Sequence, residues 1–419
     1  MTQEKKHSGT GQDCPKGYES CDGYRIPKEW HIVRFDSLFS RVTRKNDENN
    51  QNVLTISAQQ GLISQIEYYN TLYASENKTG YTLLHRGDFS YNKSYSSGYA
   101  YGAIKRLDAY EKGIVSPLYL CFTPRQGVNS DFYLQYFETG CFDREIYKIA
   151  QEGARNHGLL NVSTEDFFHS MLVFPPLEEQ ERIAEILIQC DRLIELKEQK
   201  LDELKQLKKE FLRKMFPAKG CDTPEIRFPG FTGAWEQRKL GEIATFINGR
   251  AYSQPELLSS GKYKVLRVGN FYTNDSWYYS DLELGEKYYA DYGDLLYTWS
   301  ATFGPHIWLG DRVIYHYHIW KINLSDQLEK QFAVQLLEQD RTNILSSKNG
   351  STMVHITKEG MEQKDVIIPP STKEQQEIGA FFLQLDNLIT LHQRELEETK
   401  TYKKTLAKLL LTGIVRVQG

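Results

Sequence analysis

Apolar residues recur at helical spacing along two long stretches of the chain. In the first, Ile183, Leu187 and Leu204 belong to a series with steps of mostly three or four. Ile378 and Phe382 begin a similar series in the second, and charged residues fill the positions between. Steps of three and four place side chains on one face of an α-helix. A pair of prolines precedes each stretch, and proline is tolerated only before or within the first helical turn. The pattern predicts two long amphipathic helices.

The two stretches are copies of one another. PPLEEQERI (175–183) returns as PPSTKEQQEI (369–378), and the match continues for more than twenty residues at a constant separation. Matched positions include Gln180 with Gln375, Asp191 with Asp386, and Lys208 with Lys403. Such a fixed separation indicates an internal duplication, because helical composition alone would not keep individual residues in register.

Each narrow apolar stripe requires a surface to pack against. One interpretation is that the two helices pair with each other, and the alternative is that each helix packs on its own domain. The residues expected to pair are Ile183, Leu187, Leu193, Ile194, Leu201 and Leu204 with Ile378, Phe382, Leu388, Ile389 and Leu396.

The segments ahead of the helices correspond more faintly. Each begins with a tryptophan, Trp30 or Trp235, and each contains a Gly-Asp turn that leads into an aromatic strand, RGDFSYNKSY or YGDLLYTWSA. Between these anchors the two halves diverge, and a loop rich in proline and glycine joins them. We therefore predict an α+β protein with two globular domains of mixed structure, each followed by a long helix. The expected boundaries are 1–23 for a flexible tail, 24–173 for domain 1, 174–217 for the first helix, 218–233 for the linker, 234–366 for domain 2, and 367–419 for the second helix with a tail.

Composition narrows the classes of function. The chain has 419 residues, 40% of them hydrophobic, and no apolar run approaches the ~18 residues that a membrane helix needs. Its polar start lacks the apolar core of a signal peptide, so we expect a cytoplasmic protein. A net charge of −4 argues against a protein that simply coats nucleic acid, whereas 27 Tyr and 6 Trp suit recognition surfaces.

Motifs for catalysis are missing from the sequence. There is no GxxxxGK[ST] loop and no GxGxxG motif, and Phe174 and Ile368 precede the proline pairs where an adenine methyltransferase has an acid or Asn. The run VIYHYHIWKI (313–322) reads as a strand with His316 and His318 on one face. These two histidines could bind a metal ion, but the default interpretation is that they are exposed or hydrogen-bonded histidines of a strand. We expect no catalytic residue, no metal and no cofactor in this chain.

Polar loops rich in Tyr, Asn, Lys and Gly are the remaining candidates for chemistry. Amides and guanidiniums on such loops can contact base edges, and lysines can contact phosphates. The candidate DNA-contacting residues are Gln59, Gln60, Asn92, Lys93, Tyr95, Lys105, Arg106 and Arg155 in the first domain, and Asn248, Arg250, Arg267, Asn270, Trp299, Ser300, His306, Lys348 and Asn349 in the second.

With its repeated PP…EQ…I helices, its tryptophan-led domains and TPEIRFPGFTGAWEQRKLGEI (223–243), the chain resembles the specificity subunit of a type I restriction-modification enzyme. The resemblance implies that each domain reads one half of an interrupted double-stranded DNA target, and that the helices form an antiparallel coiled coil that sets the spacing. It also implies two methyltransferase subunits, which bind S-adenosylmethionine and methylate adenine N6, and two motor-nuclease subunits, which use ATP and Mg. The alternatives are the specificity subunit of a methylation-only system and a coiled-coil scaffold that binds protein.

Overall fold

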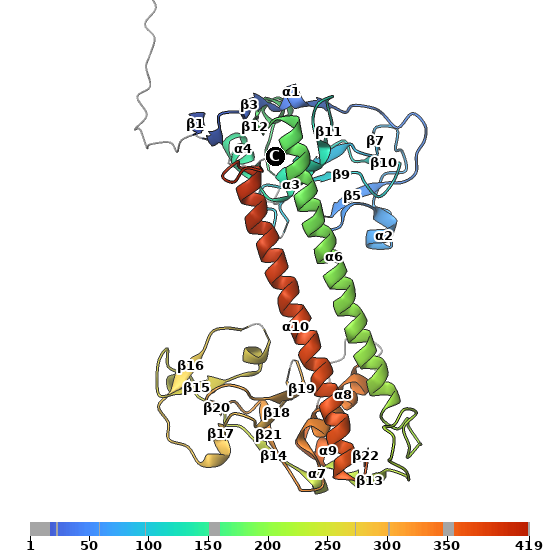
Figure 1. Ribbon diagram of the computed structural model, residues 1–419, viewed down its shortest axis with the longest axis vertical. Coiled ribbons are helices and arrows are strands. Elements are labelled where there is room, and N and C mark those ends of the chain that lie inside the picture. The colour runs from blue at the N-terminus through green and yellow to red at the C-terminus, as the bar shows by residue number, and fades with distance from the viewer. Residues whose placement is uncertain are drawn as a thin grey trace, which may run out of the picture. The chain divides into compact units, whose positions relative to one another are not determined.

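The computed structural model describes residues 17–21, 24–57, 59–96, 98–150, 160–272, 274–300, 302–346 and 356–417. The chain forms two compact units. Unit 1 comprises Met1–Leu196 and Leu396–Gly419, and unit 2 comprises Lys197–Glu395. The two long helices each contribute one part to each unit (Figure 1). No helix in the described parts of the chain is long and apolar enough to cross a membrane.

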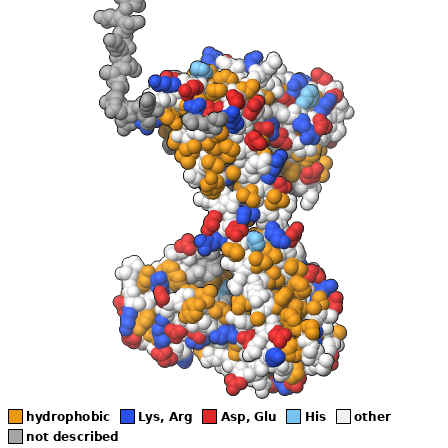
Figure 2. Space-filling view, viewed as in Figure 1, with side chains coloured by type: hydrophobic (Ala, Val, Ile, Leu, Met, Phe, Trp, Pro, Cys, Tyr) orange, Lys and Arg blue, Asp and Glu red, His pale blue; other side chains and the backbone are white. Residues whose placement is uncertain are grey.

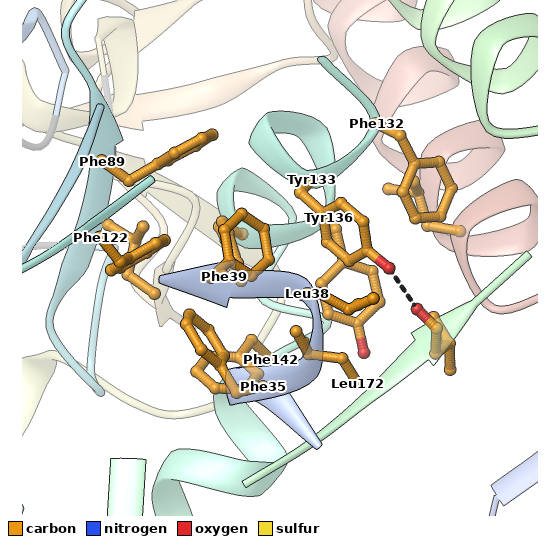
Figure 3. Packing of buried hydrophobic residues seen from close by; sticks show 14 of the residues in the cluster. Phe35, Leu38, Phe39, Phe89, Phe122, Phe132, Tyr133, Tyr136, Phe142 and Leu172 are labelled. Carbon is orange, nitrogen blue, oxygen red and sulfur yellow. Dashed lines mark hydrogen bonds between the residues drawn. The ribbon is translucent and has the colours of Figure 1, made fainter. Parts of the chain in front are cut away.

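Unit 1 is built on an antiparallel sheet of four strands packed against a helix. In spatial order the strands are β4 (Phe39–Arg41), β11 (Leu120–Pro124), β8 (Phe89–Asn92) and β9 (Ala103–Arg106), and α3 (Ser130–Glu138) follows β11. Aromatic rings from both layers form the core (Figure 3). Phe89 and Phe122 stack with their centroids 5.4 Å apart, and Phe39 meets Tyr133 edge to face at 5.2 Å. The Tyr133 hydroxyl donates to the carbonyl oxygen of Val173 at 2.7 Å, which satisfies its only polar group.

Shorter elements complete unit 1. The paired strands are β1 (Tyr18–Cys21) with β2 (Tyr24–Pro27), β3 (His31–Arg34) with β12 (Met171–Phe174), β5 (Leu54–Ser57) with β6 (Gly61–Ser64), and β7 (Thr82–His85) with β10 (Lys112–Val115). The short helices are α1 (Phe35–Leu38), α2 (Gln65–Tyr69), α4 (Asp143–Ile149) and α5 (Thr164–His169). β1 corrects one prediction, because it lies in the span assigned to a flexible tail. Its backbone pairs with β2, and the Tyr18 hydroxyl donates to the carbonyl oxygen of Gly413 at 2.8 Å.

Unit 2 contains an equivalent sheet and a second one. The equivalent sheet has the order β14 (Ala244–Asn248), β21 (Ile319–Leu324), β18 (Leu295–Thr298) and β19 (Gly304–Ile307). The second sheet has the order β16 (Tyr278–Ser280), β15 (Tyr263–Leu266), β20 (Val313–Tyr315) and β17 (Tyr289–Ala290). The other elements are β13 (Glu236–Lys239) paired with β22 (Asp365–Ile368), α7 (Leu240–Ile243), α8 (Lys330–Ser346), α9 (Lys358–Glu362), and the 3-10 turns Gln254–Glu256, Val268–Phe271 and Glu286–Tyr288.

The duplication seen in the sequence is therefore a duplication of fold. The sheet of unit 1 and the equivalent sheet of unit 2 connect their strands in the same antiparallel order, and a helix follows the equivalent strands β11 and β21. The Gly-Asp turns match in detail. Gly87 and Gly293 have φ of +90° and +88°, a region that favours glycine. After each glycine an aspartate accepts a backbone N–H from three residues earlier, Asp88 from His85 at 2.7 Å and Asp294 from Asp291 at 2.8 Å.

The predicted helices are α6 (Leu177–Lys214) and α10 (Thr372–Leu411), and they run antiparallel within each unit. In unit 2, Lys197 pairs with Glu395 at 2.9 Å, whereas Lys208, further along α6, pairs with Asp386, earlier in α10, at 2.6 Å. In unit 1, Asp191 of α6 pairs with Lys403 of α10 at 2.5 Å. The two stripes thus face each other, as the matched patterns predicted.

The stripes also pack on their own domains, so both interpretations of the stripes hold. Ile183 and Leu187 lie in the core of unit 1 together with Leu410 of α10. Ile378 and Phe382 lie in the core of unit 2 together with Phe216, which follows α6. Leu201, Leu204 and Leu396 are also buried, whereas Ile194 and Ile389 are half-buried.

Two residues predicted to pair are not in the seam. Leu193 is 47% exposed, and its equivalent Leu388 is 39% exposed. An α-helix turns about 100° per residue, so adjacent residues cannot both face one partner helix. The neighbouring isoleucines take the partly buried position in each copy, and this displaces the two leucines to the surface.

A buried carboxylate joins the start of each helix to its domain. In unit 2, Glu374 is 1% exposed and accepts a hydrogen bond from the indole Nε1 of Trp235 at 3.2 Å. The guanidinium of Arg227 donates to both of its oxygens, from Nε at 2.7 Å and from Nη2 at 2.8 Å. A buried carboxylate requires paired donors, and these two partners supply donors to both of its oxygens.

The equivalent carboxylate in unit 1 is Glu179. It accepts a hydrogen bond from the indole of Trp30 at 2.8 Å, and Arg416 donates to both oxygens at 2.6 and 2.9 Å. Arg227 lies in the segment after α6, and Arg416 lies in the segment after α10. The backbone supports the equivalence, since Ile226 N–H donates to Lys214 and Val415 N–H donates to Leu409. The C-terminal segment thus supplies the arginine that pairs with the buried carboxylate of unit 1, as the linker does for unit 2.

Next to each carboxylate, a fully buried glutamine joins the helix to the next layer. Gln180 donates to the carbonyl of Pro175 at 2.8 Å and accepts the N–H of Asn129 at 3.0 Å, immediately before α3. Gln375 donates to the carbonyl of Pro369 and accepts the N–H of Glu329, immediately before α8. The repeated EQ pair therefore positions the helix that covers each sheet.

A second polar cluster repeats further along the helices. Gln135 of α3 donates to Asp191 at 2.8 Å, and the same aspartate pairs with Lys403. In unit 2, Gln335 of α8 donates to Asp386 at 3.1 Å, and that aspartate pairs with Lys208. Each cluster ties the sheet-covering helix to both long helices.

Replacing Arg227 with Met should lower the free energy of unfolding of unit 2 by about 3 kcal/mol, because it leaves a buried carboxylate without its cation. Arg416→Met should destabilise unit 1 in the same way and by a smaller amount, since that guanidinium is more exposed. Hydrogen exchange followed by mass spectrometry, with peptides assigned to each unit, measures both effects. Arg213→Met is the control, because Arg213 pairs only on the surface. Loss of protection in the wrong unit, or in neither, would contradict the assignment.

Candidate nucleic-acid interface

Many of the predicted contact residues lie on two equivalent hairpins. β8 and β9 form the hairpin of unit 1, and β18 and β19 form the hairpin of unit 2. The connections between their strands differ in length and sequence, Lys93–Gly102 in one and Trp299–Phe303 in the other. The two units thus present different side chains at one position of a common frame.

In unit 1 the hairpin loop combines anchored and exposed residues. Asn92 accepts the N–H of Ser94 at 3.0 Å, so its carbonyl oxygen shapes the loop. Lys93 donates to the carbonyl oxygen of Val162 at 2.6 Å, and burial lowers the pKa of its ammonium group. Tyr95 is 64% exposed, and its ring is available for contact.

The two basic residues of β9 are neutralised by acidic neighbours. Lys105 is 4% exposed and pairs with Glu138 of α3 at 2.6 Å. Arg106 pairs with Asp108 and Asp131, both at 2.7 Å, and these carboxylates raise its pKa although burial opposes them. Both side chains join the sheet to α3 or to the loop beside it, and neither presents a free charge.

Gln59 and Gln60 form the turn between β5 and β6 and are exposed. Gln59 lines a groove of about 750 Å³ together with Tyr99, Lys105 and Lys403. This groove brings the first predicted loop of unit 1 next to the base of its hairpin.

In unit 2 the predicted residues gather at one end of the four-stranded sheet. Asn248 is the exposed last residue of β14 and lies opposite Trp320 in β21. Trp299 follows β18, and its backbone N–H donates to the carbonyl of His318 at 3.1 Å. Its indole Nε1 donates to the carbonyl of Tyr317 at 2.9 Å, and its ring stacks on Trp320 at 5.7 Å. Ser300, the next residue, is half-buried.

Other predicted residues hold the adjoining loops. The side-chain oxygen of Asn270 accepts the N–H of Arg267, and its amide donates to the carbonyls of Asn274 and Ser276. The Arg267 guanidinium lies over the ring of Tyr278 at 4.2 Å. Asn270 therefore stabilises the loop through its hydrogen bonds, and the Arg267 guanidinium makes a cation–π contact with Tyr278.

Arg250 follows β14 and pairs with Glu256 at 2.6 Å. This hydrogen bond raises the pKa of Arg250, and it lowers the pKa of Glu256 to about 2. Arg250 also lies 5.1 Å from the ring of Tyr252.

His306 of β19 is enclosed by aromatic and hydroxyl groups. Its ring stacks on Phe271 with a centroid separation of 4.1 Å, and its Nε2 lies 3.1 Å from the Tyr272 hydroxyl and 3.3 Å from that of Thr298. Burial, with a smaller effect from Arg341, lowers the pKa of His306 to about 4. The imidazole is therefore neutral near pH 7.

Three predicted residues, Arg155, Lys348 and Asn349, lie outside the described residues. The prediction of a single strand over 313–322 is wrong. β20 ends at Tyr315 and β21 begins at Ile319, so His316, Tyr317 and His318 form a turn. The predicted contacts did not include this turn, although the alternating run YHYH (315–318), which begins at the last residue of β20, was a visible signal. Across the described ranges, no three His, Cys, Asp or Glu side chains are grouped to hold a metal.

Comparison with known proteins identifies the family. The sequence profile of the type I restriction modification DNA specificity domain matches residues 27–206 and again 233–401. The chain belongs to this family. The two matches include the two hairpins and most of α6 and α10, so the family domain is present twice.

Individual relatives agree over nearly the whole chain. It is 24% identical to the type I restriction enzyme MjaVIII specificity subunit of Methanocaldococcus jannaschii, covering 96% of this chain and 97% of that protein. A solved chain from work on complex assembly and conformational transition of the type I R-M system shares the fold, with a TM-score of 0.59, 16% identity, and coverage of 94% and 100%. The type I restriction-modification S subunit from M. genitalium has a TM-score of 0.53 at 14% identity and coverage of 91% and 96%. This specificity-family member therefore has two recognition domains.

The lowered pKa of His306 predicts how the stability of unit 2 changes with pH. Its folded-state pKa of about 4 lies below the ordinary value near 6.5, so the unfolded chain binds the proton more readily. The contribution of the neutral His306 imidazole to the free energy of unfolding is therefore complete above pH 6.5, and it is lost as the pH falls toward 4. His306→Gln should therefore reduce the loss of stability between pH 7 and pH 5, measured by urea unfolding. An identical pH dependence in variant and wild type would contradict a buried, neutral imidazole.

Proposed function

We propose that this chain is the DNA-reading subunit of a type I restriction-modification complex. Each unit reads one half of an interrupted duplex target, and the paired helices set the distance between the halves. The helices also dock two methyltransferase subunits, which methylate adenine N6 in each half. Two motor-nuclease subunits complete the restriction complex, which acts in the cytoplasm.

The observation that carries the proposal is the repeated frame around unlike loops. Trp30, Glu179 and Arg416 in unit 1 match Trp235, Glu374 and Arg227 in unit 2, as the distances above show. Inside this frame the hairpin connections differ in length and in sequence. A duplicated frame suits two half-sites, and divergent loops suit two different base sequences.

The surface chemistry fits contacts to base edges better than a broad phosphate-binding face. On the face shown in Figure 2, acidic and basic side chains are interspersed over each unit. Within the predicted set, Gln59, Gln60, Tyr95, Asn248 and Trp299 present exposed or half-exposed polar and aromatic groups. Lys105 and Arg106 are excluded from the proposed contacts because acidic side chains neutralise them. The methyltransferase subunits would then supply much of the phosphate contact.

Exposed leucines on the long helices support docking of a partner present in two copies. Leu193 and Leu196 of α6 are 47% and 62% exposed, and the equivalent Leu388 and Leu391 of α10 are 39% and 51% exposed. Apolar side chains at matched places on two copies of one helix suit two identical partners.

The reaction itself belongs to the partners in this proposal. The methyltransferase subunits bind S-adenosylmethionine, and the motor-nuclease subunits bind ATP and Mg. In this division of labour, the chain contributes base selection and geometry.

Exchanging residues 235–361 for the equivalent span of a relative should change only one half of the target. The exchanged span begins at Trp235, which donates to Glu374, and it leaves α6, α10 and both buried carboxylates in place, so the frame persists. Selection of bound sequences from a random duplex library, with the methyltransferase subunits present, reads out both halves. The reciprocal exchange of residues 30–167 is the matched control and should change the other half. If either exchange altered both halves together, the units would not read independently.

Four residues inserted into both helices, after Leu196 and after Glu395, should lengthen the preferred gap by about two base pairs. An α-helix rises ~1.5 Å per residue, so the insertion adds ~6 Å, against ~3.4 Å per base step. Both helices must be extended, because Lys197 and Glu395 pair at this level. Affinity for duplexes with gaps of graded length measures the shift.

The same four residues placed after Gly220 provide the control. Met215 and Phe216 are buried in the core of unit 2, so an insertion in the following loop enlarges a surface loop and leaves the helices unchanged. The gap preference of this control should equal that of the wild type. A double insertion that kept full affinity at the original gap and none at longer ones would show that the helices are not the ruler.

A further inference from the structure

The turn between β20 and β21 lies where three segments of unit 2 meet. His316 N–H donates to the carbonyl of Leu266, at the end of β15, at 2.9 Å. Tyr317 N–H donates to the carbonyl of Arg250, just after β14, at 3.0 Å. Gly249 permits this approach, because a Cβ there would lie 2.3 Å from the carbonyl oxygen of His316. The end of β14 and the end of β15 thus fix the turn from two sides.

The hairpin loop fixes the turn from a third side. The carbonyl of His318 accepts the backbone N–H of Trp299 at 3.1 Å, and the carbonyl of Tyr317 accepts its indole at 2.9 Å. The carbonyl of His316 accepts the N–H of Ile319 at 3.0 Å. All three carbonyls of the turn are therefore occupied by protein donors, and the backbone is held rigidly.

The three side chains of the turn remain available. Their rings lie in contact, with centroids 4.4 Å apart for His316 and Tyr317 and 3.9 Å apart for Tyr317 and His318. Tyr317 is 39% exposed, and both histidines are half-exposed. Within the described ranges, no side chain bonds to the Tyr317 hydroxyl or to Nε2 of either histidine. A rigid turn thus presents three unpaired polar groups.

Both histidines are neutral at physiological pH. Burial, then the neighbouring His318 and Arg267, lowers the pKa of His316 to about 4, and burial also lowers the pKa of His318. A neutral imidazole has one donor and one acceptor nitrogen, and a phenol hydroxyl can also do both. Base edges in the major groove present donors and acceptors in patterns that such groups can distinguish.

Polar atoms without partners are concentrated beside the turn. Nη1 of Arg250, the hydroxyl of Tyr252 and Nε of Arg267 are buried and have no hydrogen-bond partner among the described residues. Arg267 also has no carboxylate partner there, whereas Arg250 has Glu256. Buried donors left unpaired cost free energy, and a bound partner that satisfies them recovers it. The Arg267 charge is suited to a phosphate next to the bases that the turn contacts.

We propose that His316, Tyr317 and His318 form the base-reading element of unit 2, and that Arg267 contacts a phosphate of the same half-site. The proposal rests on the function proposed above, keeps Arg267 from the predicted contacts, and adds His316, Tyr317 and His318, which were not among them. Trp299 donates hydrogen bonds to two backbone carbonyls of the turn, and it is therefore a positioning residue.

Tyr317→Phe and His318→Ala test the base contacts in the complex with the methyltransferase subunits, using a random duplex library and then the selected duplex. Each variant should lose about tenfold or more of its preference at one or two positions of one half-site. The other half-site and the affinity for unrelated duplex should not change. Tyr317→Phe removes only a hydroxyl, so its fold is preserved even if His318→Ala is less stable.

Arg267→Gln should behave differently, weakening all duplexes alike and reducing the slope of log affinity against log salt by about 0.9. Tyr292→Phe is the matched control, since it is a 74% exposed tyrosine at the opposite end of β18, and it should match the wild type. If the Tyr317→Phe and His318→Ala complexes selected the same bases as the wild-type complex, this inference would be wrong, and the proposed function would stand. A wild-type complex that selects no sequence would overturn the proposed function and the inference with it.

Discussion

Both units depend on a carboxylate buried where a long helix enters its domain. Glu179 and Glu374 are each held by an indole from the start of the domain and a guanidinium from the segment after the opposite helix. One carboxylate in each unit thereby joins three parts of the chain that are far apart in sequence. Because an unpaired buried charge is costly, the arrangement forms only when all three parts are in place. Beside this contact, the adjacent Gln180 and Gln375 position the covering helix, α3 or α8.

In the proposed function, a division between frame and surface lets one fold serve two sequences. The frame consists of the buried carboxylates with their indole and guanidinium partners, the buried glutamines and the Gln–Asp–Lys clusters, which recur in both units. The proposed recognition surface consists of hairpin loops and turns whose backbone is fixed by the frame but whose side chains are free to differ. In unit 2, for example, Trp299 fixes the turn at Tyr317 through backbone carbonyls, which places little restriction on the side chains that the turn carries.

The repeated pattern was sufficient to predict the duplication and the two long helices, because periodicity and residue matches are local properties. The antiparallel direction of their pairing was predicted only by the resemblance to the family. Contacts between distant residues were not predictable. The sequence suggested Lys105 as a DNA contact because no nearby residue in the sequence shows that Glu138 neutralises it. Arg416 gave no signal, since its partner lies more than two hundred residues away. The run Val313–Ile322 read as one strand because its composition favours strands, whereas tertiary hydrogen bonds to Leu266 and Arg250 shape a turn at its centre.

We propose that two equivalent units read separate halves of one interrupted target. The most direct measurement is a map of N6-methyladenine across the genome of a host that carries this chain with its methyltransferase, compared with the same host lacking only this chain. The account predicts one motif of two defined parts separated by a gap of fixed length without base preference, with one methylated adenine in each part. A single uninterrupted motif, or a methylation pattern unchanged by loss of the chain, would contradict it.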